Sequence, residues 1–270
     1  MKYIILIIKG MIIGFGKIIP GVSGSLLAMS LGVYETAIYK IRYFFKNLKE
    51  NTFYFSFLGI GILISIIFGS KMILYFLNHY YALTMFLFIG LILGIVPNID
   101  KKVNKKDFIY YIITIITMMF ILLILNIKNN HTFFYENNFI SNIQVLWIGF
   151  LEAFTMITPG ISGTALFMIL GYYDFIMALF SNLFLFLFQK SIMIFIFFVS
   201  LFISIFLVSS MMNFLLSKYE KITYAMILGF GYSSIILLLR EILPKIQSPF
   251  QILNGILLLM LGLFISKKFE

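Results

Sequence analysis

The chain has 270 residues, of which 62% are hydrophobic and 11% are charged, and its mean hydropathy is +1.07. This composition excludes a water-soluble domain, which needs more polar surface. The formal net charge of +10 sits in short segments between apolar runs, where lysine and arginine act as topology signals, so nucleic acid is a poor candidate partner. The chain has no cysteine, and His79 and His131 are isolated, so we expect no disulfide, no metal and no cofactor.

Apolar segments follow one another along the chain in two similar series. A transmembrane helix needs about 20 mostly apolar residues, so each uninterrupted run of that length predicts one. The first series begins with an interrupted stretch at 3–34 and continues with runs at 53–77, 81–97 and 107–127. The second begins with an interrupted stretch at 142–173 and continues with runs at 190–216, 222–239 and 250–266. The sequence therefore predicts an all-α polytopic membrane protein that forms a single membrane domain over 1–270.

The two series match one another at a constant offset of 139 residues. The shift places Pro20-Gly21 on Pro159-Gly160, Ser23-Gly24 on Ser162-Gly163, Ser25 on Thr164, and Gly32 and Tyr34 on Gly171 and Tyr173. It continues without a gap as far as Gly90 and Gly229. A match of this length, about 80 residues, indicates an internal duplication. We expect repeat 1 over 1–127, an external loop over 128–141 and repeat 2 over 142–270.

Charged loops predict how the two copies are oriented. Three lysines and one arginine at 40–49 precede two predicted crossings and four lysines at 101–106 follow them, so both clusters share a side. By the positive-inside rule that side is the cytoplasm, with Arg240 and Lys245 as exceptions. The segment 179–188, which corresponds to the first cluster, carries no charge. This difference favours two inverted-topology repeats, each with one re-entrant helical hairpin and three transmembrane helices, and places both termini in the cytoplasm.

Each interrupted stretch contains the motif Pro-Gly-x-Ser-Gly. Proline cannot donate a backbone hydrogen bond and disfavours helix in the residue before it, so each helix is expected to unwind there. In duplicated transporters such breaks form the ligand site, and proline, glycine and hydroxyl groups at a helix start make an anion cradle. The predicted cradle residues are Pro20, Gly21, Ser23, Gly24, Ser25, Pro159, Gly160, Ser162, Gly163 and Thr164. The alternative is that these small residues only allow close helix packing.

Two charged residues lie in the same apolar stretches. Lys17 is three residues before Pro20, and Glu152 is seven residues before Pro159. Charges inside a membrane are costly and usually face the bundle interior or a cavity. We expect Lys17 to neutralise an anionic ligand, and Glu152 to pair with Lys17 or to carry a coupling proton. The alternative is that Lys17 reaches the interface and Glu152 caps a helix end, while Tyr34, which borders its stretch, is expected to be an interfacial anchor.

The motifs resemble those of the bacterial polyprenyl-phosphate transporter family. The matching segments are Gly-Lys-Ile-Ile-Pro-Gly-Val-Ser-Gly-Ser (16–25), Leu-Gly-Val-Tyr-Glu (31–35), Thr-Pro-Gly-Ile-Ser-Gly-Thr (158–164) and Leu-Gly-Tyr-Tyr-Asp (170–174). The resemblance covers essentially the whole chain and implies a cytoplasmic-membrane protein that returns undecaprenyl phosphate, a carrier lipid, from the outer to the inner leaflet. The family commonly has an Ala-Asp pair where this chain has Gly16-Lys17, so no role of that acid is transferred. Ser25 also replaces a family glycine.

Two other functions are compatible with parts of this pattern. A polyprenyl-diphosphate phosphatase also has inverted repeats with serine-containing re-entrant segments, but it needs a motif arginine and acidic residues. No arginine follows Ser23 or Ser162 in the motifs, so we expect no enzymatic activity. A transporter of another anionic lipid or of a small anion stays open, because the cradle selects a negative charge and not a tail. A homo-oligomer is also compatible with the sequence.

Overall fold

The computed structural model describes residues 2–18, 22–103, 108–125, 133–181, 183–246 and 248–269. Within these residues the chain forms helices joined by short connections, and none of them lies in a strand. A helix satisfies its backbone hydrogen bonds within its own segment, which is why so apolar a sequence adopts this structure in a membrane. The predicted all-α class is confirmed for the described part of the chain.

The first half of the chain begins with three helices that cover the interrupted stretch. They are α1 (Lys2–Ile18), α2 (Gly24–Ser30) and α3 (Tyr34–Arg42). A 3-10 turn, η1 (Phe44–Asn47), leads into α4 (Leu48–Ile64), which continues through a π-helical turn, η2 (Ser65–Gly69), into α5 (Ser70–His79). The long helices α6 (Tyr81–Lys102) and α7 (Phe108–Leu125) follow. The run predicted at 53–77 is therefore helical throughout, with a π-helical turn near its middle.

The second half repeats this order of elements. It begins with α8 (Phe139–Ile157), α9 (Gly163–Leu170) and α10 (Tyr173–Ser181), and the short α11 (Leu183–Gln189) follows. The long helices are α12 (Ser191–Lys218), α13 (Glu220–Ile242) with the 3-10 turn η3 (Leu243–Lys245), and α14 (Pro249–Phe269). Short helices separate the first helix from the long helices in both halves: α2 and α3 in the first half, and α9, α10 and α11 in the second.

Several of these helices are suited to a membrane by length and composition. In the described residues, α6, α8, α12, α13 with η3, and α14 are long and apolar enough to cross one, and α7 contributes a shorter apolar helix. The outward side chains are large and apolar, as shown by Phe195 and Phe264, which are 70% and 63% exposed. Lipid is the solvent that such a surface requires. The structure therefore fits the predicted multi-pass membrane protein.

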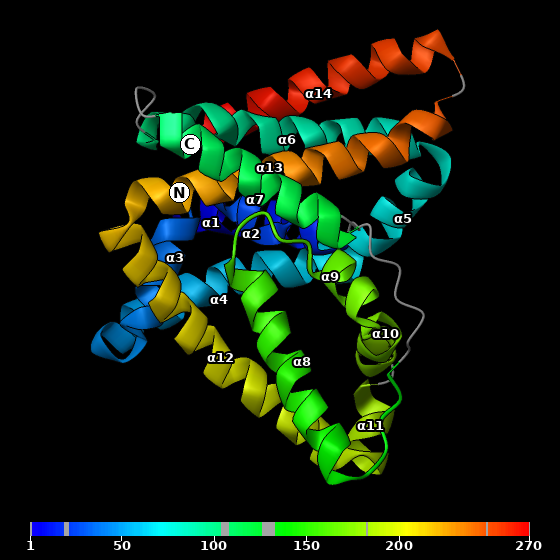
Figure 1. Cartoon of the computed structure of the whole chain (residues 1–270). Coiled ribbons are helices and arrows are strands. Elements are labelled where there is room, and N and C mark those ends of the chain that lie inside the picture. The colour runs from blue at the N-terminus through cyan, green and yellow to red at the C-terminus, as the bar shows by residue number, and fades with distance from the viewer. Residues whose placement is uncertain are drawn as a thin grey trace.

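The long helices pair reciprocally between the two halves. α6 packs along α14, α13 packs along α7, and α6 and α13 contact each other between these pairs. Figure 1 shows α6, α13 and α14 running side by side across one end of the molecule, while α8 and α12 converge toward the other end. In each pair, the second long helix of one half packs on the third long helix of the other. This exchange ties the two halves together.

Close contacts between helices recur with the same offset as the sequence. A Cβ atom on Gly10 of α1 would collide with the carbonyl oxygen of Leu58 in α4. A Cβ atom on Gly149 of α8 would lie 2.8 Å from the carbonyl oxygen of Phe197 in α12. Each residue of the second pair lies 139 positions after its counterpart in the first. Both helix pairs thus use a glycine at the same place to bring their backbones together.

The short helix α2 is anchored in the hydrophobic core. Leu26 and Leu27 are fully buried or nearly so, in the same cluster as Met85 and Ile89 of α6 and Ala225 of α13. α2 also contacts α8, the first helix of the second half. This packing fixes the start of α2, with its motif serines, against the other half of the chain.

Alanine substitutions at two helix glycines test the packing of α6 on α14. Gly90→Ala should lower the free energy of unfolding by about 1–3 kcal/mol, because the new Cβ would collide with the carbonyl oxygen of Leu259 in α14. Gly59→Ala is the control, because no heavy atom of another element lies within 4 Å of its Cβ position. Its expected effect is a gain of up to about 1 kcal/mol from helix propensity. Thermal unfolding in detergent measures the stability of both variants. Equal changes in the stability of Gly90→Ala and Gly59→Ala would contradict the close packing of α6 on α14.

Candidate functional site

The first broken segment is capped by its own serine. α1 ends at Ile18, α2 begins at Gly24, and Ser23 is the residue that precedes α2. The Ser23 hydroxyl accepts a hydrogen bond of 3.4 Å from the Leu26 amide, which satisfies one of the free amides at the helix start. The predicted site residues Pro20 and Gly21 lie outside the described residues.

The second broken segment depends on a glycine. α8 ends at Ile157 and α9 begins at Gly163, and in the linker between them Pro159 and Gly160 are buried. Gly160 has a φ angle of +87°, a conformation that side chains rarely adopt. A Cβ atom on Gly160 would also lie 2.5 Å from the Cβ atom of Phe230 in α13. Both the backbone conformation and the close approach of α13 therefore require glycine here.

The two broken segments meet through a directed chain of hydrogen bonds. The Gly160 amide donates to the Ser23 hydroxyl at 3.2 Å, and the Ser25 hydroxyl donates to the Thr158 carbonyl at 3.0 Å. The two serine hydroxyls are 3.0 Å apart. A carbonyl can only accept, so the Ser25 hydroxyl donates its single proton to the Thr158 carbonyl. The hydrogen bond between the two serines must therefore be donated by Ser23 and accepted by Ser25. The serines of the first motif thus clamp the linker of the second.

Hydroxyl groups of two further helices bind two more carbonyls at this break. Tyr34 of α3 donates to the Ile157 carbonyl at 2.8 Å, and Ser234 of α13 donates to the Gly160 carbonyl at 2.9 Å. Tyr34 is only 3% exposed, so the expectation that it is an interfacial anchor is wrong. Its phenol is buried because a carbonyl is available to accept from it. The motif analysis missed Ser234, which lies outside both motifs.

A second pair of hydroxyls lies on the other side of the contact. The Ser162 and Thr164 hydroxyls are 3.0 Å apart, and both residues lie 139 positions after Ser23 and Ser25. Ser23 and Ser162 are both buried, with 2% and 9% of their surfaces exposed. Hydroxyl donors in such a place can bind the oxygens of an anion. Because Ser23 and Ser25 have protein partners in this structure, an anion would have to replace those partners.

The two intramembrane charges lie next to each other across the halves. Lys17 Nζ, in the last turn of α1, is 3.8 Å from Glu152 Oε1 of α8. The side chains are 33% and 16% exposed, so the pair is partly open to its surroundings. The lysine also lies at the C-terminal end of its helix, where the helix dipole favours a cation. The structure therefore brings both charged candidates to one place.

The last glycine of each motif lies beside these charges. A Cβ atom on Gly24 would lie 3.3 Å from Lys17 Cγ, and one on Gly163 would lie 2.7 Å from Thr155 Oγ1 and 3.9 Å from Glu152 Oε2. Because neither glycine carries a side chain, the Lys17 and Glu152 side chains have room to lie beside the motifs. Charges, hydroxyls and unwound backbone thus form one polar site within an apolar bundle. The described chain has no cluster of three His, Asp or Glu side chains that could hold a metal ion.

A second polar cluster joins α3, α6 and α13. Glu35 forms an ion pair with Lys102 and accepts a hydrogen bond from Tyr224, and Lys102 Nζ lies 2.8 Å from the Tyr224 hydroxyl. Burial alone would raise the pKa of Glu35, but the hydrogen bonds and the positive charge of Lys102 outweigh it and hold the pKa below its usual value. Because Glu35 follows Tyr34, this cluster also positions the helix that binds the α8–α9 linker.

Acidification should weaken this cluster. A carboxylate whose pKa is depressed by folding contributes stability above its unfolded pKa, near 4.5, and loses it as the pH falls through the folded pKa. We expect Glu35→Gln to unfold at a lower temperature than the wild type at neutral pH, and the difference to narrow below pH 4.5. The control is Asp174→Asn at the corresponding position of the second half, where the described residues provide no hydrogen bond or ion pair. A difference that is constant with pH would contradict the assignment.

Known proteins resemble this chain over most of its length. The family described as undecaprenyl phosphate translocase-like matches residues 13–248, which include both motifs. A polyprenyl-phosphate transporter from Staphylococcus aureus is 27% identical over 238 residues, covering 85% of this chain and 83% of the relative. A polyprenyl-phosphate transporter from Vibrio cholerae is 28% identical over 187 residues, covering 64% of this chain and 59% of the relative. No solved structure matches. The chain therefore belongs to the undecaprenyl phosphate translocase-like family, in agreement with the resemblance of its motifs.

Proposed function

We propose that the protein moves polyprenyl phosphate, specifically undecaprenyl phosphate, between the leaflets of the bacterial cytoplasmic membrane. The family and the names of two relatives support this substrate class. The observation that carries the proposal is the direct contact of the two broken helices, which brings Lys17 and the motif hydroxyls to one site between the halves. Such a transfer would recycle the carrier lipid for synthesis of the cell envelope, and it requires no catalytic residue.

The two halves are proposed to be inverted repeats with re-entrant hairpins at 3–34 and 142–173. The reciprocal pairing of α6 with α14 and of α13 with α7 supports a two-fold relation between them. The charged segment 40–49 and its uncharged counterpart 179–188 support opposite orientations in the membrane. Both termini are then cytoplasmic. Alternating access follows from rocking one repeat against the other around the site.

Lys17 and the motif hydroxyls would bind the phosphate, while the isoprenoid tail stays in lipid. A buried charge-assisted hydrogen bond is about twice as strong as a neutral one, so Lys17 supplies the largest single contribution. Glu152 competes with the phosphate for this lysine, because both are anions. Phosphate binding therefore releases Glu152 from Lys17 and makes the carboxylate available to accept a coupling proton.

The hydrogen bonds between the motifs link phosphate binding to the opening of the site. Ser23 accepts from Gly160, and Ser25 donates to Thr158, so the tips are held together by groups that also suit an anion. A phosphate oxygen can accept from the Gly160 amide and from both hydroxyls, and it thereby replaces contacts between the halves. A ligand with different contacts in the two states shifts their populations, which is the requirement for transport.

Leaflet transfer of labelled undecaprenyl phosphate in liposomes tests the function. The wild type should transfer the lipid faster than protein-free liposomes do. Lys17→Gln and Ser23→Ala should each slow transfer on the order of tenfold, which corresponds to the loss of one charge-assisted or buried hydrogen bond. Lys267→Gln, at an exposed lysine near the end of α14, is the control and should transfer at the wild-type rate.

The outcomes of this assay separate the function from the site. Wild-type transfer at the protein-free rate would refute lipid transport, and accompanying uptake of inorganic phosphate would identify a small-anion transporter. An active wild type with unchanged Lys17→Gln and Ser23→Ala variants would refute only the proposed site.

Single cysteines test the inverted topology. The chain has no native cysteine, so Asn47→Cys and Ser181→Cys each introduce one labelling site. With inverted repeats, a membrane-impermeant thiol reagent added to intact cells should label Ser181→Cys and not Asn47→Cys. After permeabilisation both should react. Labelling of both variants from the same side would rule out inversion.

A further inference from the structure

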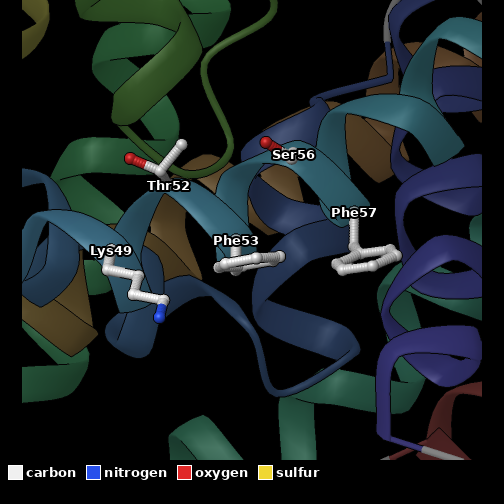
Figure 2. A pocket seen from close by; sticks show the side chains of 5 residues that line it. All are labelled: Lys49, Thr52, Phe53, Ser56 and Phe57. Atoms are coloured by element: carbon white, nitrogen blue, oxygen red, sulfur yellow. The ribbon is translucent and has the colours of Figure 1, made fainter.

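A pocket of about 320 Å³ lies on α4, outside the site described above. It is lined by Lys49, Thr52, Phe53, Ser56 and Phe57. Figure 2 shows Lys49, Phe53 and Phe57 pointing to the same side of the helix, while Thr52 and Ser56 project from its upper side. Residues four positions apart lie on one face of a helix, so a cation and two rings share this surface. No residue of either motif lines the pocket.

The positive charge of Lys49 is uncompensated. Within the described residues Lys49 makes no hydrogen bond or ion pair, whereas the neighbouring acid, Glu50, pairs with Lys40 at 2.7 Å. The next cation along the chain, Lys46, lies 4.8 Å from the centre of the Tyr43 ring and adds to the positive surface. The residue that corresponds to Lys49 in the second half is Phe188. The cation of the pocket is therefore particular to the first half, and the pocket is no part of the duplicated site.

An open apolar strip continues from the pocket along the same helix. Phe53, Ile60 and Leu63 are 50%, 44% and 56% exposed. No heavy atom of another element lies within 4 Å of the Cβ position of Gly59, so the protein leaves this part of the strip uncovered. At one side Tyr3 of α1 stacks on Phe57, with ring centres 4.5 Å apart. A cation at one end and an apolar strip beyond it complement a phospholipid. The anionic headgroup would lie at the cation, and the acyl chain would lie along the strip.

We propose that this pocket binds an anionic phospholipid of the cytoplasmic leaflet. Lys49 pairs with the headgroup phosphate, and an acyl chain lies along Phe53 and the open surface at Gly59. Charge selects the occupant, because a zwitterionic headgroup carries its own cation, which Lys49 repels. The proposal depends on the membrane location of α4 and not on the transported substrate.

Native mass spectrometry of the full-length protein tests the site. Phosphatidylglycerol and phosphatidylcholine are added at equal concentrations to protein in detergent, and the retained lipids are counted. The wild type should retain more phosphatidylglycerol than phosphatidylcholine. Lys49→Gln should weaken this binding about fivefold, the contribution of one lysine near an anionic surface, while the matched control Lys267→Gln should match the wild type.

A second variant tests the acyl strip. Gly59→Phe should fold, because the space around Gly59 is open, and should reduce retention of phosphatidylglycerol by covering the strip. Equal retention of both lipids by the wild type, or equal effects of Lys49→Gln and Lys267→Gln, would overturn the proposal. So would displacement of phosphatidylglycerol from the wild type by undecaprenyl phosphate, which would make the substrate the occupant. In phosphatidylcholine liposomes, Lys49→Gln should transfer undecaprenyl phosphate at the wild-type rate.

Discussion

The unwound segment between α8 and α9 must satisfy its backbone polar groups without water, and this requirement organises the centre of the molecule. In hydrocarbon each unpaired group costs several kcal/mol. The carbonyls of Ile157, Thr158 and Gly160 accept hydrogen bonds from hydroxyls on α3, α2 and α13. Two of these helices belong to the other half of the chain. The break in one half is therefore stable only because the other half packs against it.

The intramembrane charges obey the same rule. A lone Lys17 or Glu152 would be costly in the bundle, whereas side by side their charges largely cancel. Breaking such a pair by removing one partner costs more than removing both, because it leaves an uncompensated charge. The glycines beside the pair, Gly24 and Gly163, leave room for the two charged side chains. The polar centre is thus balanced in both hydrogen bonds and charge.

The sequence predicts the elements of this centre but not how they pair. Uninterrupted apolar runs located the long helices, and the Pro-Gly motifs located the break between α8 and α9, because both signals are local. Tyr34 was misplaced since its partner, the Ile157 carbonyl, is 123 positions away, and no local pattern encodes that contact. Gly160 was predicted to form part of an anion cradle, and no local pattern indicated that its φ of +87° and the approach of Phe230 also require glycine. The serines were recognised as donors, but the groups they bind emerge only from the packing of α2 on α8.

Charge balance also constrains the proposed transport cycle. A phosphate monoester carries about −1.5 to −2 charges at neutral pH, and Lys17 can offset only part of that. If Glu152 stays ionised when the phosphate displaces it, the site gains a net negative charge in a medium of low dielectric, which is strongly unfavourable. Proton uptake by Glu152, the proposed coupling residue, would remove one of these charges when the lysine changes partner. On the proposed mechanism, proton uptake is therefore a consequence of exchanging one anion for another at Lys17, and it needs no separate proton site.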